Sequence, residues 1–488
     1  MFEGIYPVLC LPGETCCILE DTFVSKIAQP SSTNQPTPAY FLSLELENVR
    51  CFGPRQKLDF SDGLGRPAQW TVILGENGVG KTTLLQCLVG MEPLIRTVIR
   101  EGKMYLAKFP RLFAKQFGKN EKKFEQLPRV RSDQMQIRAS IFHGTSLREL
   151  NRGVSFESNI RYVKEDQKWE VESNAVILQH YEHLISFCCY GYGAARRMRL
   201  SAPVSEKEDN IGDWDTLFDE DAALGNAEEW LLKTYLNARV SDSDDLRDRF
   251  QKQFDTIVEV LKKILPDIQD IKVPKLKSFD ESARVEFQTP YSWVLIQDLG
   301  IGHRTMIAWV VDLARRLFER YPNSADPLSE PAVVLVDEID LHLHPKWQRD
   351  IIQFLSERFT NTQFIVTAHS PLIVQAASDV NARIALLEKE GDHVIIRQDF
   401  PSIRSWQIDQ VLLSELVGLP STFSPKTEKL LNERMKILTK GRLSKSDHQR
   451  IKELEKEIGP LPSGQSRTEI EARELIRRAA ERLRQQGA

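Results

Sequence analysis

The chain has 488 residues, of which 41 % are hydrophobic and 27 % charged, and its formal net charge is −4. These values are typical of a globular protein of two or three domains and exclude disordered, collagen-like and disulfide-scaffold classes. No uncharged apolar run approaches the roughly 18 residues of a membrane span, and the start lacks the pattern of a secretory signal. The seven cysteines form no C-x-x-C pair, so we expect a reduced, cytoplasmic protein without a membrane partner.

In chain order, the patterns predict five parts and an α/β fold class. Residues 91–184 are predicted to be mixed helix and loop, and residues 227–265 to be helices. The five parts are an N-terminal extension and linker (1–39), the first part of a head (40–98), a helical and mixed insertion (99–284), the second part of the head (285–400) and a basic helical C-terminal region (401–488).

The head is predicted from short apolar runs. A β-hairpin is expected about Gly53-Pro54, and the run at 70–74 is typical of a buried parallel strand. Val333 to Val336 and Phe364 to Val366 predict two more buried strands. Residues 284–296 alternate like a strand, and helical spacing follows from Gly302 to Arg320.

A phosphate-binding loop follows the first buried strand. Its glycines permit a tight turn whose backbone N–H groups point at phosphate oxygens. Lys81 reaches the β- and γ-phosphates, the Thr82 hydroxyl binds Mg²⁺, and a helix from Thr83 points its N-terminus at the anion. We therefore expect ATP and Mg²⁺ as ligands of the G-x-x-x-x-G-K-[ST] sequence Gly75, Glu76, Asn77, Gly78, Val79, Gly80, Lys81 and Thr82.

Acidic and histidine side chains follow the two later strands. Asp337 and Glu338 come directly after one strand, so Asp337 would hold the Mg²⁺ shell and Glu338 would activate water as general base. His369 ends the other strand, where it can contact the γ-phosphate. His342 and His344 could suggest a metal site, but no cysteine or further histidine completes a zinc set, and we favour a loop-shaping role.

These motifs resemble those of the ABC-type ATPase heads of the RecF/SMC/OLD group, over residues 40–98 and 285–400. The resemblance implies a head with a mixed or parallel sheet, a large insertion between Walker A and Walker B, and a helical C-terminal appendage. It also implies a homodimer or higher homo-oligomer that sandwiches ATP between the phosphate loop of one subunit and the signature segment of another. That segment lacks the signature serine here, but Gly300 and Gly302 would leave room for the phosphate; it reads Asp298, Leu299, Gly300, Ile301, Gly302, His303, Arg304.

More narrowly, residues 190–197, 217–219 and 416–425 resemble the PtuA-type ATPases of the Septu anti-phage systems. This resemblance implies an ATPase that senses or regulates a separate, PtuB-like HNH endonuclease. We expect no intrinsic nuclease, because no H-N-H pattern or acidic cluster follows the head. Two alternatives stay open: a RecF-like repair and recombination ATPase, and a nucleotide-gated scaffold with little turnover.

Basic residues gather in two stretches. Residues 96–131 carry a net charge of +8 and interleave Phe109, Phe113, Phe117 and Phe124 with lysines and arginines. These Lys and Arg side chains could bind a nucleic acid, or a helix could bury the Phe stripe. Residues 426–488 carry +6 and are predicted to form three helices, either a solvated appendage or a docking surface. Arg196 and Arg197 could contact phosphate or nucleic acid, or have a structural role.

Overall fold

A computed structural model of the chain forms two compact units, Met1–Val411 and Leu412–Ala488, which are described separately. The described residues are 7–9, 15–18, 38–100, 103–110, 127–130, 132–143, 154–163, 168–173, 187–199, 213–274, 283–440 and 443–459.

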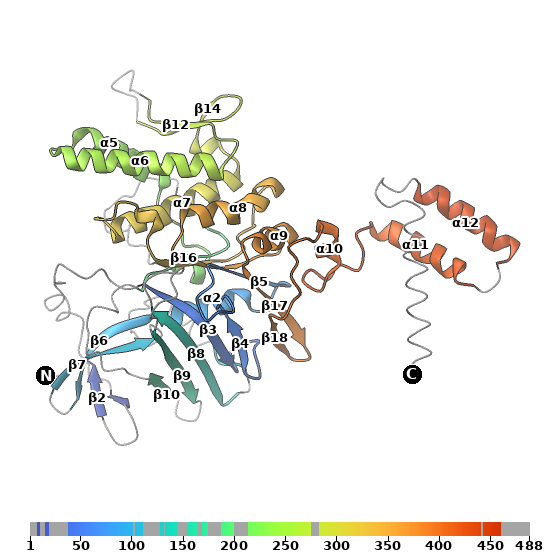
Figure 1. The fold of residues 1–488 in the computed structure, drawn as a ribbon, viewed down its shortest axis with the longest axis horizontal. Helices are drawn as coiled ribbons and strands as arrows, with labels where there is room; N and C mark the ends of the chain where they lie inside the picture. Colours follow the sequence, from blue (N-terminus) through green and yellow to red (C-terminus); the bar gives the residue numbers. More distant parts are fainter. Residues whose placement is uncertain are drawn as a thin grey trace. The chain divides into compact units, whose positions relative to one another are not determined.

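The centre of the first unit is a six-stranded sheet in the order β11-β15-β16-β5-β17-β18 (Figure 1). Neighbours from β11 to β17 are parallel, and only β18 at the edge is antiparallel. The carboxyl ends of the parallel strands therefore meet at one edge, where α/β folds bind ligands. The strands are β5 (Trp70–Gly75), β11 (Cys189–Tyr192), β15 (Ala332–Val336), β16 (Thr362–Thr367), β17 (Arg383–Glu390) and β18 (His393–Arg397).

The apolar runs explain why these segments form the centre. Every residue of β15 and β16 is buried, as expected for parallel strands covered on both faces. Trp70 of β5 stacks on Phe364 of β16 with ring centroids 4.4 Å apart. The predicted α/β fold class and its three buried strands are confirmed.

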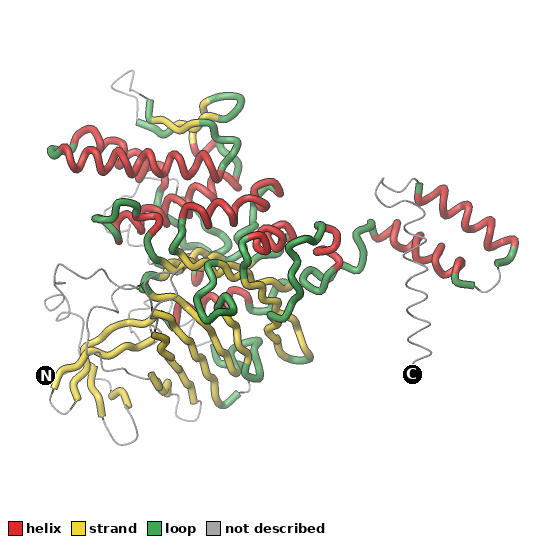
Figure 2. The backbone as a smooth tube through the Cα atoms, viewed as in Figure 1, coloured by secondary structure: helices red, strands yellow, loops and turns green. Residues whose placement is uncertain are grey.

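A five-stranded antiparallel sheet packs against this centre in the order β10-β9-β8-β3-β4 (Figure 2). Ser43 pairs with Asp59 across the predicted hairpin about Gly53-Pro54, which is confirmed. The buried Gln363 side chain of β16 joins the two sheets, because it accepts from the Phe41 N–H and donates to the Phe41 carbonyl. The strands are β3 (Ala39–Glu47), β4 (Gln56–Asp59), β8 (Gln134–His143), β9 (Val154–Val163) and β10 (Lys168–Ser173).

The prediction of mixed helix and loop for residues 91–184 is wrong over the described part, which holds β6 to β10. On β8, Met135, Ile137, Ala139 and Ile141 are buried and alternate with polar residues. This period of two is the signal of a half-buried strand. A third sheet in the order β1-β2-β6-β7 contains β1 (Pro7–Leu9), β2 (Thr15–Ile18), β6 (Pro93–Arg100) and β7 (Lys103–Pro110).

Helices α5 to α8 lie on the side of the central sheet away from the antiparallel sheet (Figure 2). The helices predicted over 227–265 and 302–320 are confirmed by α5, α6 and α7. The single strand predicted at 284–296 is instead two short strands, because the chain turns at Thr289–Ser292. The elements are α2 (Lys81–Gly90), α4 (Asp215–Phe218), α5 (Ala227–Val240), α6 (Asp244–Ile264), β12 (Asp270–Lys272), β13 (Glu286–Gln288), β14 (Trp293–Leu295), α7 (Ile301–Arg320), α8 (Pro345–Arg358), α9 (Pro371–Asp379) and α10 (Ile408–Leu413), with short 3-10 turns at Ile296–Asp298 and Pro327–Ser329.

The second unit contains the helices α11 (Pro425–Leu438) and α12 (Lys445–Ile458). Ser424 caps α11 and Pro425 occupies its first turn. Leu454 of α12 is fully buried. The third helix predicted for the tail lies outside the described residues.

Among the described residues, no helix combines the length and apolarity that crossing a bilayer requires.

Candidate nucleotide-binding site

The phosphate loop joins β5 to α2 at the carboxyl edge of the central sheet. Gly75, Gly78 and Gly80 have φ values of 145°, 81° and 93°, which favour residues without a side chain. Gly80 is the N-cap of α2 and offers no side-chain hydrogen bond to the first N–H groups of the helix. A helix N-terminus in this arrangement is suited to bind an anion.

Lys81 lies across the loop. Its Nζ donates to the carbonyl oxygens of Gly75 and Glu76, each at 2.8 Å. Burial lowers the pKa of Lys81, and Asp337, Glu338 and the nearby Asp340 oppose this shift. The predicted phosphate-binding lysine therefore has the acidic side chains as its electrostatic neighbours.

Asp337 receives two hydroxyl groups from different parts of the chain. Thr82 Oγ1 donates to Asp337 Oδ2 at 2.6 Å, and Thr367 Oγ1 donates to Asp337 Oδ1, also at 2.6 Å. The strand order places β16 between β5 and β15, so the ends of all three strands contribute to this cluster. Thr367 was not among the predicted site residues; the available signal is a hydroxyl at the end of an apolar strand, two residues before His369.

Glu338 and His369 lie together beside this cluster. Glu338 Oε1 is 3.9 Å from His369 Nε2, and the two side chains are 31 % and 37 % exposed. The Glu338 N–H donates to Thr367 Oγ1 at 2.7 Å, and the His369 N–H donates to Asp340 Oδ2 at 3.0 Å. Both side chains thus reach solvent while backbone hydrogen bonds fix their positions.

The residues present fit Mg²⁺. The Thr82 hydroxyl and the Asp337 carboxylate are oxygen ligands of the kind that Mg²⁺ prefers, and this ion usually completes its shell with water and substrate phosphates. Within the described part of the chain, no three His, Cys, Asp or Glu side chains gather as a protein cage for a metal. His344 N-caps α8 by accepting from the Lys346 N–H, and His342 has a φ of 64°, in agreement with the loop-shaping role.

The two glycines of the predicted signature segment have different surroundings. Gly302 is buried, and a side chain there would overlap the His342 carbonyl oxygen of the same chain. The absence of a side chain at Gly302 therefore permits close packing on the His342 loop, and the phosphate contact expected there stays a prediction. Gly300 is exposed and a side chain there would meet only His303, at 3.7 Å.

Arg196 and Arg197 are neighbours in the sequence but differ in burial. Arg196 is 1 % exposed and contacts the backbone of Asp337 and Glu338, whereas Arg197 is exposed. The sequence leaves two roles open for Arg196, contact with phosphate or nucleic acid and a structural role, and these backbone contacts favour the structural one.

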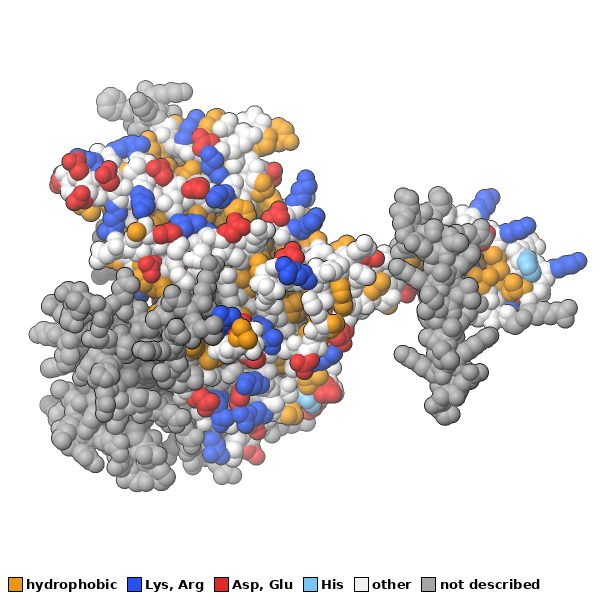
Figure 3. Space-filling model, viewed as in Figure 1, with side chains coloured by type: hydrophobic (Ala, Val, Ile, Leu, Met, Phe, Trp, Pro, Cys, Tyr) orange, Lys and Arg blue, Asp and Glu red, His pale blue; other side chains and the backbone are white. Residues whose placement is uncertain are grey.

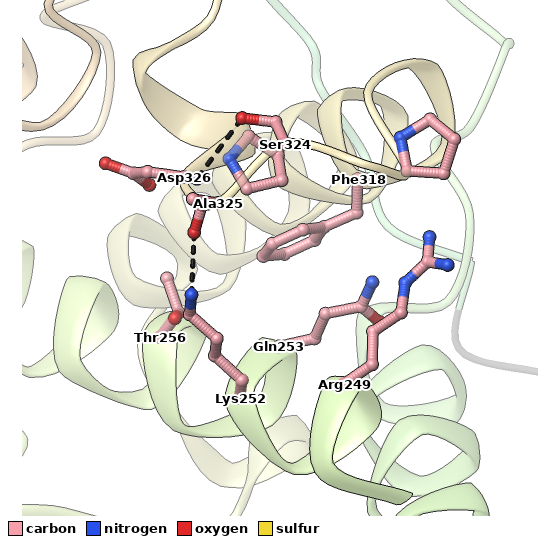
Figure 4. A pocket seen from close by; sticks show the side chains of 10 residues that line it. Arg249, Lys252, Gln253, Thr256, Phe318, Ser324, Ala325 and Asp326 are labelled. Atoms are coloured by element: carbon pink, nitrogen blue, oxygen red, sulfur yellow. Dashed lines mark hydrogen bonds between the residues drawn. The ribbon is translucent and has the colours of Figure 1, made fainter. Parts of the chain in front are cut away.

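A cavity between α6 and the segment after α7 contains none of the predicted site residues (Figure 4). Its volume is about 60 Å³. Lys252 closes one side by donating to the Ala325 carbonyl at 2.6 Å. This cavity is too small for a nucleotide.

Acidic side chains gather where α5 meets α6 (Figure 3), and they include Asp242, Asp244 and Asp245. Their charge repels nucleic-acid phosphates, so this end of the hairpin is unsuited to a nucleic acid. The contact predicted for the Lys and Arg of 96–131 stays a prediction, because Phe113, Phe117 and Phe124 lie outside the described residues.

A family model described as "AAA domain, putative AbiEii toxin, Type IV TA system" matches residues 70–375, more than half of the chain. The chain belongs to this AAA family. A second AAA-domain model matches residues 43–91. The first match spans the phosphate loop, the acidic pair and His369.

Individual relatives agree with the resemblance stated from the sequence. The chain is 25 % identical over 406 residues to the Septu protein PtuA of Bacillus mycoides (strain KBAB4), covering 82 % of this chain and 48 % of the relative. It is 35 % identical over 166 residues to the "Retron Vc95 probable ATPase" of Vibrio cholerae serotype O1 biovar El Tor, covering 34 % of this chain and 31 % of the relative. The predicted similarity to PtuA is confirmed, and the chain spans half or less of the length of these relatives.

Among solved structures, an SMC head bound to the C-winged helix domain of ScpA matches with a TM-score of 0.40 and 14 % identity, covering 74 % of this chain and 97 % of that chain.

Proposed function

We propose that this chain is a cytoplasmic, Mg²⁺-dependent ATPase that hydrolyses ATP between two copies of itself and so regulates a separate HNH nuclease in anti-phage defence. The observation that carries the ATPase part is the 2.6 Å hydrogen bond from Thr82 Oγ1 to Asp337 Oδ2. It joins the phosphate loop to the acidic end of β15 across 255 residues of sequence. Similarity to a Septu PtuA supports the defence part.

Each site residue has a role that follows from its position. Lys81 and the first N–H groups of α2 bind the β- and γ-phosphates. Thr82 and Asp337 hold the metal, and a bound Mg²⁺ supplies positive charge to the phosphate oxygens. Glu338 accepts the proton of the attacking water. His369, whose Nε2 is 3.9 Å from Glu338 Oε1, contacts the γ-phosphate.

In this proposal, the signature segment of one chain contacts the ATP bound by the other copy and not the ATP in its own phosphate loop. A second copy is therefore needed. The exposed Gly300 and the uncapped N-terminus of α7 face the ATP held by the partner copy. The missing signature serine favours a second candidate, in which bound ATP holds an oligomer together and turns over slowly.

A turnover assay separates these candidates. Full-length protein is measured with ATP and Mg²⁺, with EDTA, and as Asp337→Asn. The ATPase proposal expects phosphate release that EDTA and Asp337→Asn each abolish. Nucleotide binding without phosphate release would contradict turnover and support the scaffold.

A co-purification experiment tests the partner. The chain is expressed with HNH-family proteins encoded beside its gene, and a stable complex is expected by size-exclusion chromatography. Absence of such a neighbour, or of any complex, would contradict the nuclease-regulator proposal and leave the ATPase proposal standing.

A further inference from the structure

Arg196 lies behind the acidic turn of the candidate site, on the loop that follows β11. Because β11 is the parallel neighbour of β15, its carboxyl end lies beside Asp337. The Asp337 N–H donates to the Tyr192 carbonyl at 2.8 Å. The Arg196 loop therefore begins in direct contact with the turn that carries Glu338.

The guanidinium contacts two successive backbone groups of this turn. Arg196 Nη1 donates to the Asp337 carbonyl at 2.5 Å, and Nη2 donates to the Glu338 carbonyl at 2.9 Å. The planar fork of arginine suits two acceptors held side by side, because it directs one nitrogen at each of them. Arg196 thus makes its hydrogen bonds to the backbone of the turn and not to either carboxylate.

The turn needs such support because its backbone is strained. Glu338 has a φ of 49°, in the left-handed region that side chains other than glycine rarely occupy. Arg196 itself has a φ of 36°. Strain of this kind persists only where the surrounding contacts fix it.

The Arg196 loop is braced from its far side. Thr216 Oγ1 accepts from the Gly193 N–H at 3.1 Å and donates to the Gly191 carbonyl at 3.2 Å. The next residue, Leu217, accepts a 2.8 Å hydrogen bond from the Gln86 amide of α2. The helix that begins at the phosphate loop therefore supports the loop that carries Arg196.

Charge explains why a buried arginine is tolerated. Burial lowers the pKa of Arg196 to about 10, and Asp337, Asp340 and Glu338 oppose the shift, so the side chain stays charged at neutral pH. Its Nε has no hydrogen-bond partner among the described residues. The contacts of this cation are therefore concentrated on the acidic turn.

We propose that Arg196 is a positioning residue whose guanidinium holds the Asp337–Glu338 turn, and with it the Glu338 carboxylate beside His369. This inference rests on the proposed ATPase function for its catalytic consequence, but not for its structural one. Arg196 does not touch the nucleotide; it acts through Glu338.

The test compares Arg196→Met with Arg197→Met, a matched change at the exposed neighbour. Hydrogen–deuterium exchange of nucleotide-free protein reports on the N–H groups of Glu338, Ile339 and Leu341, which are bonded within or across this turn. Their exchange should be about 10- to 100-fold faster in Arg196→Met and unchanged in Arg197→Met. Unchanged exchange in a folded Arg196→Met would overturn the proposal.

Turnover provides the second readout. In Arg196→Met, kcat should fall about 100-fold while the affinity for a fluorescent ATP analogue stays within about twofold. Arg196→Lys keeps the charge but not the planar two-nitrogen fork, so it should recover part of kcat. This variant is used in place of Arg196→Met if Arg196→Met does not fold. Lost nucleotide binding with unchanged exchange would overturn the proposal in favour of direct phosphate contact. A wild-type chain without turnover would refute the ATPase function, while the exchange result would still decide the role of Arg196.

Discussion

The phosphate loop and the start of α7 are both loop-to-helix junctions, but they differ in their contacts within the chain. Around the phosphate loop, Thr82, Asp337 and Thr367 are joined by 2.6 Å hydrogen bonds. At the start of α7, Gly300 is exposed, no side chain caps the helix, and Ile301 is 55 % exposed. This difference motivates the proposal that the chemistry is preorganised within one chain and that a partner copy supplies the contact at the start of α7.

The largest effect is expected at the phosphate loop. Lys81→Ala removes the cation proposed to bind the β- and γ-phosphates and should weaken ATP binding by about 100-fold or more, since charge-assisted hydrogen bonds contribute about 1.5–3 kcal/mol each. Isothermal titration measures the change. Lys57→Ala, the same change on an exposed strand position, is the control and should bind normally. Unchanged affinity in Lys81→Ala would remove the loop from the site.

A smaller effect is expected from the hydroxyl that fixes the acidic pair. Thr367→Val keeps the shape but removes hydrogen bonds to Asp337 Oδ1 and the Glu338 N–H. Turnover should fall about 10- to 100-fold, because each lost bond costs about 1 kcal/mol, with ATP affinity little changed. In Thr71→Val, the control, the buried hydroxyl has no hydrogen-bond partner in the described structure, and turnover should not change. Equal turnover of the two variants would show that the hydrogen bonds of Thr367 are dispensable.

The smallest effect on chemistry is expected at the start of α7, where two glycines can be compared. Gly302→Ala would overlap the His342 carbonyl and should destabilise the monomer by about 1–3 kcal/mol, seen as a lower melting temperature. Gly300→Ala should leave the melting temperature unchanged and weaken ATP-dependent dimerisation. If Gly302→Ala melts like wild type, the packing of α7 on the His342 loop is looser than described.

The sequence predicts those parts of the site whose residues are close together in the chain. Gly75 to Thr82 carries its loop, cation and helix start within one short stretch, and Asp337-Glu338 and His369 each follow an apolar strand directly. The sequence does not predict contacts between distant segments, such as Arg196 with the Asp337 carbonyl 141 residues away. No local pattern marks which backbone group a buried arginine will meet.

The same reasoning explains the fold. The strands β5, β15 and β16 are buried on both faces and are therefore continuous apolar runs that a sequence reveals. On β8, only alternate residues are buried, so this strand shows a period of two and no continuous apolar run. Which sheet a strand joins depends on partners far along the chain, as with the pairing of Leu44 and Ala139.

The central claim, that each chain preorganises the chemistry while a second copy completes the site, is tested most directly by Glu338→Gln. The amide keeps the size of the carboxylate but cannot accept a proton from water, so the variant should bind ATP with wild-type affinity and release no phosphate. Light scattering after size exclusion should then show a dimer that accumulates with ATP and Mg²⁺ and disperses with EDTA. Wild-type turnover in this variant, or a monomer in the presence of ATP, would contradict the account.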